Sequence, residues 1–257
     1  MDKAAKGQVV FDHERLDVYR LALGLVSRVE QLLRAMQTAV AAKNHLWRAS
    51  ESMVRNIVRG NTKRTPADQV QTCDVAYGSG LECAACMDVL QAWGLLEPAE
   101  VHDVKVLLDR VVAMLIGLRS TKSQQVRESR SDYIVGAQSK QAVFFAHEQL
   151  RVYQSALRFV SWCAALIQTE GMGLTRGREL DRHATGIVLN VAEGNGKFSV
   201  ADRRRFLDIA LAAGLQAAAS LDLLMARGCI AEDATRQGKN HLGEIVSMIG
   251  AMSRSLS

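Results

Sequence analysis

The sequence predicts an all-α fold made of two tandem antiparallel up-down four-helix bundles. Three observations lead to this prediction: an internal repeat, apolar residues at helical spacing, and a composition with two prolines and 5% aromatic residues in 257. Proline interrupts helices and aromatic residues favour strands, so this composition permits long helices. Hydrophobic residues make up 48% of the chain, which is enough for packed cores.

The internal repeat has a constant offset of 134 residues. The segment Phe11–Tyr19 (FDHERLDVY) matches Phe145–Tyr153 (FAHEQLRVY). Residues 11–120 align with residues 145–254 without a gap, and 34 of the 110 aligned pairs are identical. The chain therefore contains two copies of one structural unit. We expect a lead-in over residues 1–10, a first bundle over 11–119, a polar linker over 120–141 and a second bundle over 142–257.

Apolar periodicity places four helices in each repeat, and short connections favour antiparallel neighbours. In the first helix Leu16, Tyr19 and Leu23 recur every three or four residues. Thr65 is expected to cap the third helix, with Pro66 in its first turn, and Gly94 to end it. The expected helices are 12–35, 42–60, 66–93 and one opening at 98, then 146–169, 175–193, 200–227 and 231–254.

A Gly-rich turn is predicted between the second and third helices of the second repeat, and the rest of the chain is interpreted around it. Gly194 and Gly196 are expected to supply the backbone freedom that ends a helix, and Ser199 to cap the next one, with Asp202 three residues on. An earlier copy of the turn spans Asn56–Lys63. The predicted structural turn residues are Asn56, Gly60, Asn190, Glu193, Gly194 and Gly196.

Two interpretations of Asn190 and Glu193 follow, because residues three apart on a helix share a face. The first is that they hold a partner backbone or a phosphate-bearing ligand. The favoured one is that both bond to neighbouring helix ends and fix the turn, which explains the pattern without a ligand.

Basic residues gather around both copies of this turn. Several cations that converge there would bind nucleic-acid phosphates without base-specific geometry. The alternative is that they form solvated helix faces and salt bridges between subunits. The predicted nucleic-acid-binding residues are Arg48, Arg55, Arg59, Lys63 and Arg64 in the first repeat, and Arg176, Arg178, Arg182, Lys197, Arg203, Arg204 and Arg205 in the second.

No pattern of a catalytic or metal site is present in the sequence. Cys83 and Cys86 form a lone Cys-x-x-Cys in a helix, whereas zinc needs four ligands, so small residues at a helix contact are the favoured explanation. His13-Glu14 and His147-Glu148 lack the second histidine of a zinc-protease motif and are expected in a first helical turn. We expect no enzymatic activity, no metal and no cofactor.

Bulk properties favour a cytoplasmic protein. Five cysteines, an odd number without a disulfide-like pattern, fit a reducing compartment. The N-terminus has no apolar signal region, and no run approaches eighteen apolar residues, so no membrane span is expected. The net charge of +5 permits attraction to nucleic acid or to an acidic partner.

The turn and its flanks carry a resemblance to a known family. The second repeat contains Asn-x-x-Glu-Gly-x-Gly-Lys from Asn190 to Lys197, followed by Phe-Leu-x-Ile-Ala from Phe206 to Ala210. These motifs resemble the bacterial four helix bundle protein family, also called 23S rRNA intervening-sequence proteins. The family includes the accessory variability determinant of diversity-generating retroelements.

The first repeat departs from the motif. Arg59 replaces the glutamate, Thr62 replaces the second glycine, and Thr72-Cys73 replaces the Phe-Leu pair, although Tyr77–Cys83 resembles the family's third helix. The resemblance implies small helical bundles that often assemble as pentameric rings. It also implies, for the retroelement protein, a basic scaffold that binds a reverse transcriptase and its RNA.

The sequence therefore predicts a non-enzymatic oligomeric scaffold that binds nucleic acid, structured RNA in particular, or a reverse-transcriptase-like partner, through basic helix faces. The alternative is a protein–protein adaptor with the same fold and no nucleic acid. On either hypothesis we expect a homo-oligomer, in the form of a ring, that does not engage a membrane.

Overall fold

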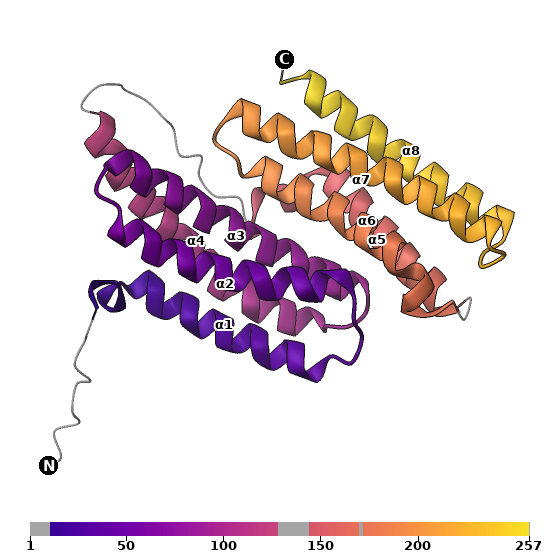
Figure 1. Cartoon of the computed structure of the whole chain (residues 1–257), viewed down its shortest axis with the longest axis horizontal. Helices are drawn as coiled ribbons and strands as arrows, with labels where there is room; N and C mark the ends of the chain where they lie inside the picture. Colours follow the sequence, from indigo (N-terminus) through magenta and orange to yellow (C-terminus); the bar gives the residue numbers. More distant parts are fainter. Residues whose placement is uncertain (1–10, 128–143, 170–171, 257) are drawn as a thin grey trace, which may run out of the picture.

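Every regular element that the structure describes is a helix (Figure 1). The computed structural model describes residues 11–127, 144–169 and 172–256. The elements are η1 (Asp12–Arg15), α1 (Asp17–Ala35), α2 (Ala41–Thr62), α3 (Pro66–Ala92), α4 (Pro98–Arg127), η2 (Ala146–Gln149), α5 (Arg151–Thr169), α6 (Gly173–Asn195), α7 (Val200–Ala226) and α8 (Glu232–Arg254). The predicted all-α fold with two tandem four-helix units is confirmed.

Each repeat forms its own four-helix bundle. In the first, α1 and α3 each pack against both α2 and α4, and in the second α5 and α7 pack in the same way against α6 and α8. Leu25, Leu46 and Leu108 lie in the first core, and Phe159 and Ile187 in the second. The apolar stripes of the helices thus face inward, as amphipathic helices require.

Local sequence signals set several helix ends as predicted. The Thr65 hydroxyl accepts a hydrogen bond from the Asp68 amide (3.2 Å), and the Ser199 hydroxyl accepts one from the Asp202 amide (3.3 Å). Each satisfies an amide that the first helical turn leaves unpaired. Gly94 follows α3 with φ +70°, in the left-handed region where glycine is favoured.

The start of each repeat differs from the prediction of one continuous helix from residue 12 and from residue 146. A 3₁₀ turn comes first, and Leu16 and Leu150 are extended before the α-helix begins. In the second repeat the Glu148 carboxylate accepts a hydrogen bond from the Phe144 amide (3.1 Å). The His147 ring stacks on Phe145 and meets Tyr153 edge to face. In the first repeat Glu14 accepts a hydrogen bond from the Phe11 amide (3.4 Å), and His13 contacts Phe11 and Tyr19 as His147 contacts Phe145 and Tyr153. These side chains hold the separate turn.

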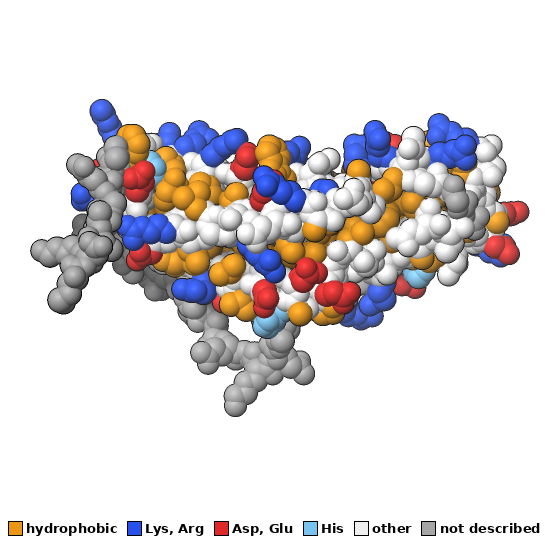
Figure 2. Space-filling view, turned by 90° about the horizontal axis from the view of Figure 1, so that it is seen from below, with side chains coloured by type: hydrophobic (Ala, Val, Ile, Leu, Met, Phe, Trp, Pro, Cys, Tyr) orange, Lys and Arg blue, Asp and Glu red, His pale blue; other side chains and the backbone are white. Residues whose placement is uncertain are grey.

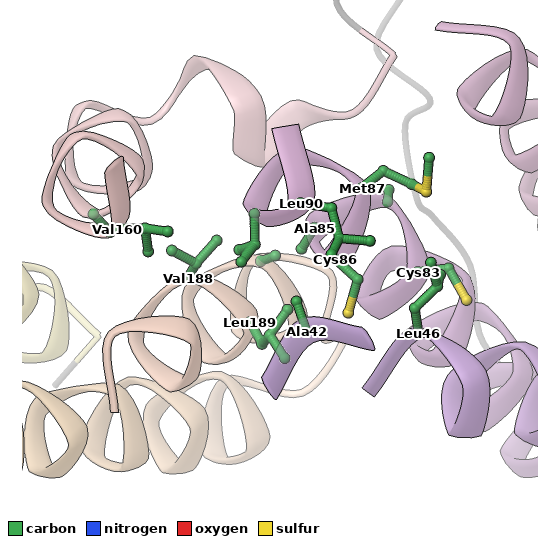
Figure 3. Packing of buried hydrophobic residues seen from close by; sticks show 14 of the residues in the cluster. Ala42, Leu46, Cys83, Ala85, Cys86, Met87, Leu90, Val160, Val188 and Leu189 are labelled. Atoms are coloured by element: carbon green, nitrogen blue, oxygen red, sulfur yellow. The ribbon is translucent and has the colours of Figure 1, made fainter. Parts of the chain in front are cut away.

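The two bundles meet along α3. This helix contacts α6 and α5 of the second bundle, and α2 also contacts α6. Figure 3 shows Leu90 of α3 close to Val188 of α6, and Ala42 of α2 beside Leu189 of α6. Small residues such as Gly78 and Ala85 are buried in α3. They allow α2 of the same bundle and α6 of the other bundle to approach the α3 backbone closely.

The segment between the bundles is helical at its start. Helix α4 continues to Arg127, so residues 120–127 of the expected linker belong to it. The remainder of that linker and the lead-in over residues 1–10 lie outside the described residues.

Helix α7 is long and apolar enough to cross a membrane by length and composition, although the sequence has no continuous run of eighteen apolar residues. Its repeat counterpart α3 has a similar small-residue, apolar composition and is buried between the two bundles. In α7 only 39% of the apolar window is buried.

Candidate functional site

The Gly-rich turn after α6 lies at the junction between the bundles. A Cβ atom on Gly196 would overlap Cδ1 of Leu81 and would lie 3.1 Å from Cε1 of Tyr77, both in α3. Gly196 has φ −83°, and Gly194 lies inside α6. The prediction that these glycines supply special backbone freedom is therefore wrong: they allow close approach instead.

The polar turn residues form contacts that need no ligand. Glu193 and Lys197 pair at 2.7 Å, and a Cβ on Gly78 of the other bundle would lie 3.1 Å from Nζ of Lys197. The Asn190 amide donates to the carbonyl of Gly186 (2.7 Å), and Asn56 does the same to Ser52 (2.8 Å). The amides thus bond within their own helices rather than to neighbouring helix ends as predicted.

Gly60 and Gly194 occupy the same position in the two repeats and serve packing inside each bundle. A Cβ on Gly60 would lie 2.9 Å from Oγ1 of Thr72, and one on Gly194 would lie 3.0 Å from Cβ of Phe206. Both glycines allow the third helix of the bundle to approach the second.

The basic residues of the first repeat lie on the outer face of α2 and in the turn after it. Arg48, Arg55 and Arg59 line a groove of about 460 Å³ together with the exposed Trp47. Arg55 pairs with Glu51 (2.7 Å). Within the described residues Arg48, Arg59, Lys63 and Arg64 form no ion pair, so their charges are available to an anion.

Only part of the predicted basic group of the second repeat lies at the turn. Arg176, Arg178 and Arg182 lie near the start of α6, whereas Lys197 follows its end. Lys197 follows Arg176 by 21 positions, and at about 1.5 Å per residue this places them about 32 Å apart. The cations are therefore spread along α6 and the start of α7 and do not form one cluster at the turn.

Near the turn itself, two of the predicted cations serve the fold. The Arg203 guanidinium donates to the carbonyl of Lys197 (3.2 Å), and the Lys197 ammonium lies 4.4 Å from the centroid of the Phe206 ring. Arg204 and Arg205 are exposed at the start of α7, with Arg205 3.9 Å from Asp202.

A second groove of about 600 Å³ runs beside α6 and α7 and reaches α2. Its polar lining includes Arg182, His183, Arg205 and Asp208, and His45 of α2 closes one side. Because His45 precedes Arg48 by one helical turn, the two grooves adjoin along α2. Figure 2 shows one face of the molecule, where Lys and Arg side chains form separate groups with hydrophobic side chains exposed between them.

A buried ion network at the junction was not identified from the sequence. The Lys105 ammonium contacts Asp88 (2.5 Å) and Glu148 of the second bundle (2.8 Å), and the Tyr153 hydroxyl donates to Asp88 (2.7 Å). Burial and the nearby lysine lower the pKa of His147 to about 3, so this ring is neutral. The sequence signal that could have revealed this network is the recurrence of Asp88 and Lys105 as Asp222 and Lys239 in the second repeat.

This network contains a group of potential metal ligands that is already paired with a lysine. Ligand atoms of Asp88, His147 and Glu148 lie within 4.8 Å of one another, the only such group among the described residues. The Lys105 ammonium already supplies the positive charge that the carboxylates need.

The Cys-x-x-Cys pair is fully buried in α3, and burial raises the pKa of the Cys83 and Cys86 thiols. Protonated thiols in a close helix contact act as small apolar groups, since metal binding and redox chemistry use the thiolate.

Comparison with known proteins identifies one family. The model of the 23S rRNA-intervening sequence protein family matches residues 14–117 and again residues 148–251. The two matches coincide with the two bundles. No curated protein and no solved structure matches the chain.

Proposed function

Because the chain belongs to the 23S rRNA-intervening sequence protein family through both of its repeats, we propose that it is a non-enzymatic cytoplasmic scaffold that binds structured RNA. The observation that carries this proposal is the groove on α2, where Arg48 and Arg59 have no anionic partner among the described residues. Phosphate binding needs several such cations and no base-specific geometry.

The counterparts of these residues strengthen the argument. On α6 the positions of Arg55 and Arg59 are Leu189 and Glu193, which pack at the junction. The first repeat therefore carries two added positive charges on a face that its own bundle does not need. The chain as a whole has a net charge of +5, which favours encounter with a polyanion.

A titration with a structured RNA hairpin tests the proposal. Fluorescence anisotropy at several salt concentrations is expected to show binding that weakens steeply with salt. Replacing Arg48, Arg55 and Arg59 by Ala removes up to three phosphate contacts. The slope of the logarithm of the binding constant against the logarithm of the salt concentration is therefore expected to become less steep by about two to three. The matched control replaces the exposed Arg34, Arg236 and Arg254, which changes net charge equally. Absence of binding at low salt, or equal loss in both variants, would refute the proposal.

The second candidate function is a protein–protein adaptor, which the exposed apolar residues of α7 favour. Leu215 and Leu223 are exposed there, and grouped apolar residues on a surface mark interaction sites. A reverse-transcriptase-like protein is one partner of this kind. Capture of such a protein by a chain that binds no RNA would favour the adaptor.

A further inference from the structure

The junction between the two bundles joins unlike surfaces. The third helix of the first repeat (α3) packs on the second helix of the second repeat (α6). Such a contact is heterologous, so it leaves one complementary surface unused at each end of the chain. The unused surfaces are the outer face of α7, which corresponds to α3, and the outer face of α2, which corresponds to α6.

The outer face of α7 retains the apolar residues that α3 buries. Leu81 of α3 is 3% exposed, whereas its counterpart Leu215 is 58% exposed. Val89 is 0% exposed, and its counterpart Leu223 is 55% exposed. We call the exposed set Asp208, Leu215, Leu223 and Arg227 the donor face.

The polar residues of the junction are repeated without change at the two ends of the chain. Asp88 and Lys105 have the counterparts Asp222 and Lys239, which pair with each other at the surface. Glu148 and Tyr153 have the counterparts Glu14 and Tyr19. Both halves of the buried network are thus present, one at each end of the chain.

Where residues differ, they differ in complementary pairs. At the junction the indole of Trp93, at the end of α3, lies beside the Asp181 carboxylate of α6. The counterparts are Trp47 on α2 and the exposed Arg227 after α7. At the free ends of the chain, the pair of a carboxylate and an indole is therefore replaced by a pair of an indole and a guanidinium. A guanidinium is attracted to the face of an indole ring.

A second pair shows the same exchange. At the junction the Arg119 guanidinium lies 3.6 Å from the centroid of the Phe198 ring and pairs with Asp74. The counterparts of Phe198 and Asp74 are Arg64 and Asp208, and Ser253 replaces Arg119. An exposed arginine and an exposed aspartate therefore take the place of the ring contact.

We propose that a second copy of this chain docks its donor face onto the α2 face of the first, defined by Trp47, Arg55, Arg59, Thr62 and Arg64 and called here the acceptor face. This head-to-tail contact would supply an interface for the homo-oligomer that the sequence leads us to expect. Thr62 and Arg55 stand where the junction has Gly196 and Leu189, so the contact between chains is looser than the junction. Because the acceptor face includes Arg55 and Arg59, RNA is expected to compete with assembly.

Light scattering with size-exclusion chromatography tests the docking without any RNA, so its result is independent of RNA binding. The wild-type chain is expected to form assemblies at multiples of 28.1 kDa that grow with concentration. A donor variant, Leu215→Glu with Leu223→Glu, and an acceptor variant, Trp47→Glu with Arg64→Glu, are each expected to be monomeric. The matched control Val106→Glu, on the opposite face of α4 from Val104 and Leu108, is expected to assemble normally.

Mixing the two variants separates head-to-tail docking from the alternatives. Each retains one intact face, so an equimolar mixture is expected to form a dimer and nothing larger. In single-substitution chains, Arg64→Glu is expected to raise the dissociation constant about tenfold, and adding Asp208→Arg to the same chain is expected to restore it.

Three results would overturn the proposal. One is a wild-type chain that stays monomeric at every concentration. Another is a donor variant that loses assembly while the acceptor variant keeps it, which would indicate a symmetric α7–α7 contact. The third is monomeric wild-type chain that binds phospholipid vesicles while the donor variant does not, which would assign the apolar face of α7 to a membrane.

Discussion

Replacing Gly196 by Ala tests whether this glycine is required for contact between the bundles. The added Cβ would overlap Cδ1 of Leu81 and crowd the Tyr77 ring. Overpacking of this kind costs about 1–3 kcal/mol of unfolding free energy. The backbone at φ −83° accommodates alanine, so the cost reports the contact alone. Guanidinium denaturation followed by circular dichroism measures it.

Two further variants complete the test. Gly117→Ala on α4 meets no atom within 4 Å of the new Cβ and, as a helical glycine replacement, is expected to stabilise by about 0.5–1 kcal/mol. Leu81→Ala removes the obstructing methyl group at a cost of about 2–5 kcal/mol. Combined with Gly196→Ala, the loss is expected to fall short of the sum by about 1 kcal/mol or more. A neutral Gly196→Ala, or strict additivity, would refute the contact.

Three more predictions concern the junction and the caps. Lys105→Met leaves two buried carboxylates without their cation and is expected to cost about 3–5 kcal/mol in denaturant unfolding, whereas its exposed counterpart Lys239→Met should cost under about 1 kcal/mol; equal costs would argue against the buried network. The pKa of His147 falls from 6.5 to about 3, so between these values the unfolded chain binds a proton that the folded chain does not, and acid favours unfolding. Wild type is therefore expected to lose on the order of 2 kcal/mol more stability than His147→Phe between about pH 7 and pH 5, and parallel losses would contradict the buried neutral ring. Ser199→Ala removes the α7 cap and should cost about 1 kcal/mol, measured in the same way, while an unchanged midpoint would count against the cap.

The sequence was sufficient to predict features that depend on local signals. Thr65 and Ser199 cap their helices because each stands directly before a helical segment. Each helix could also be predicted from two copies of its pattern, one in each repeat. The 3₁₀ turn at His147 was missed because it depends on ring contacts with Phe145 and Tyr153, which helical spacing does not reveal.

Contacts between the repeats could not be predicted from the sequence. The role of Gly196 depends on Leu81, which lies in the other bundle, and Lys105 bonds Glu148 across 43 residues. Periodicity shows that a face is apolar but does not identify its neighbour. The basic residues were predicted to converge for the same reason: Arg176 and Lys197 stand in one helical region but at its opposite ends.

Lysine acetylation with mass-spectrometric readout tests the junction most directly, because Lys105 and Lys239 occupy the same repeat position. The measurement uses the donor variant, in which Leu215→Glu and Leu223→Glu are combined, so that a second copy of the chain does not cover Lys239. The buried Lys105, held between Asp88 and Glu148, is expected to react far more slowly than the exposed Lys239. Equal labelling rates at the two lysines would contradict the account.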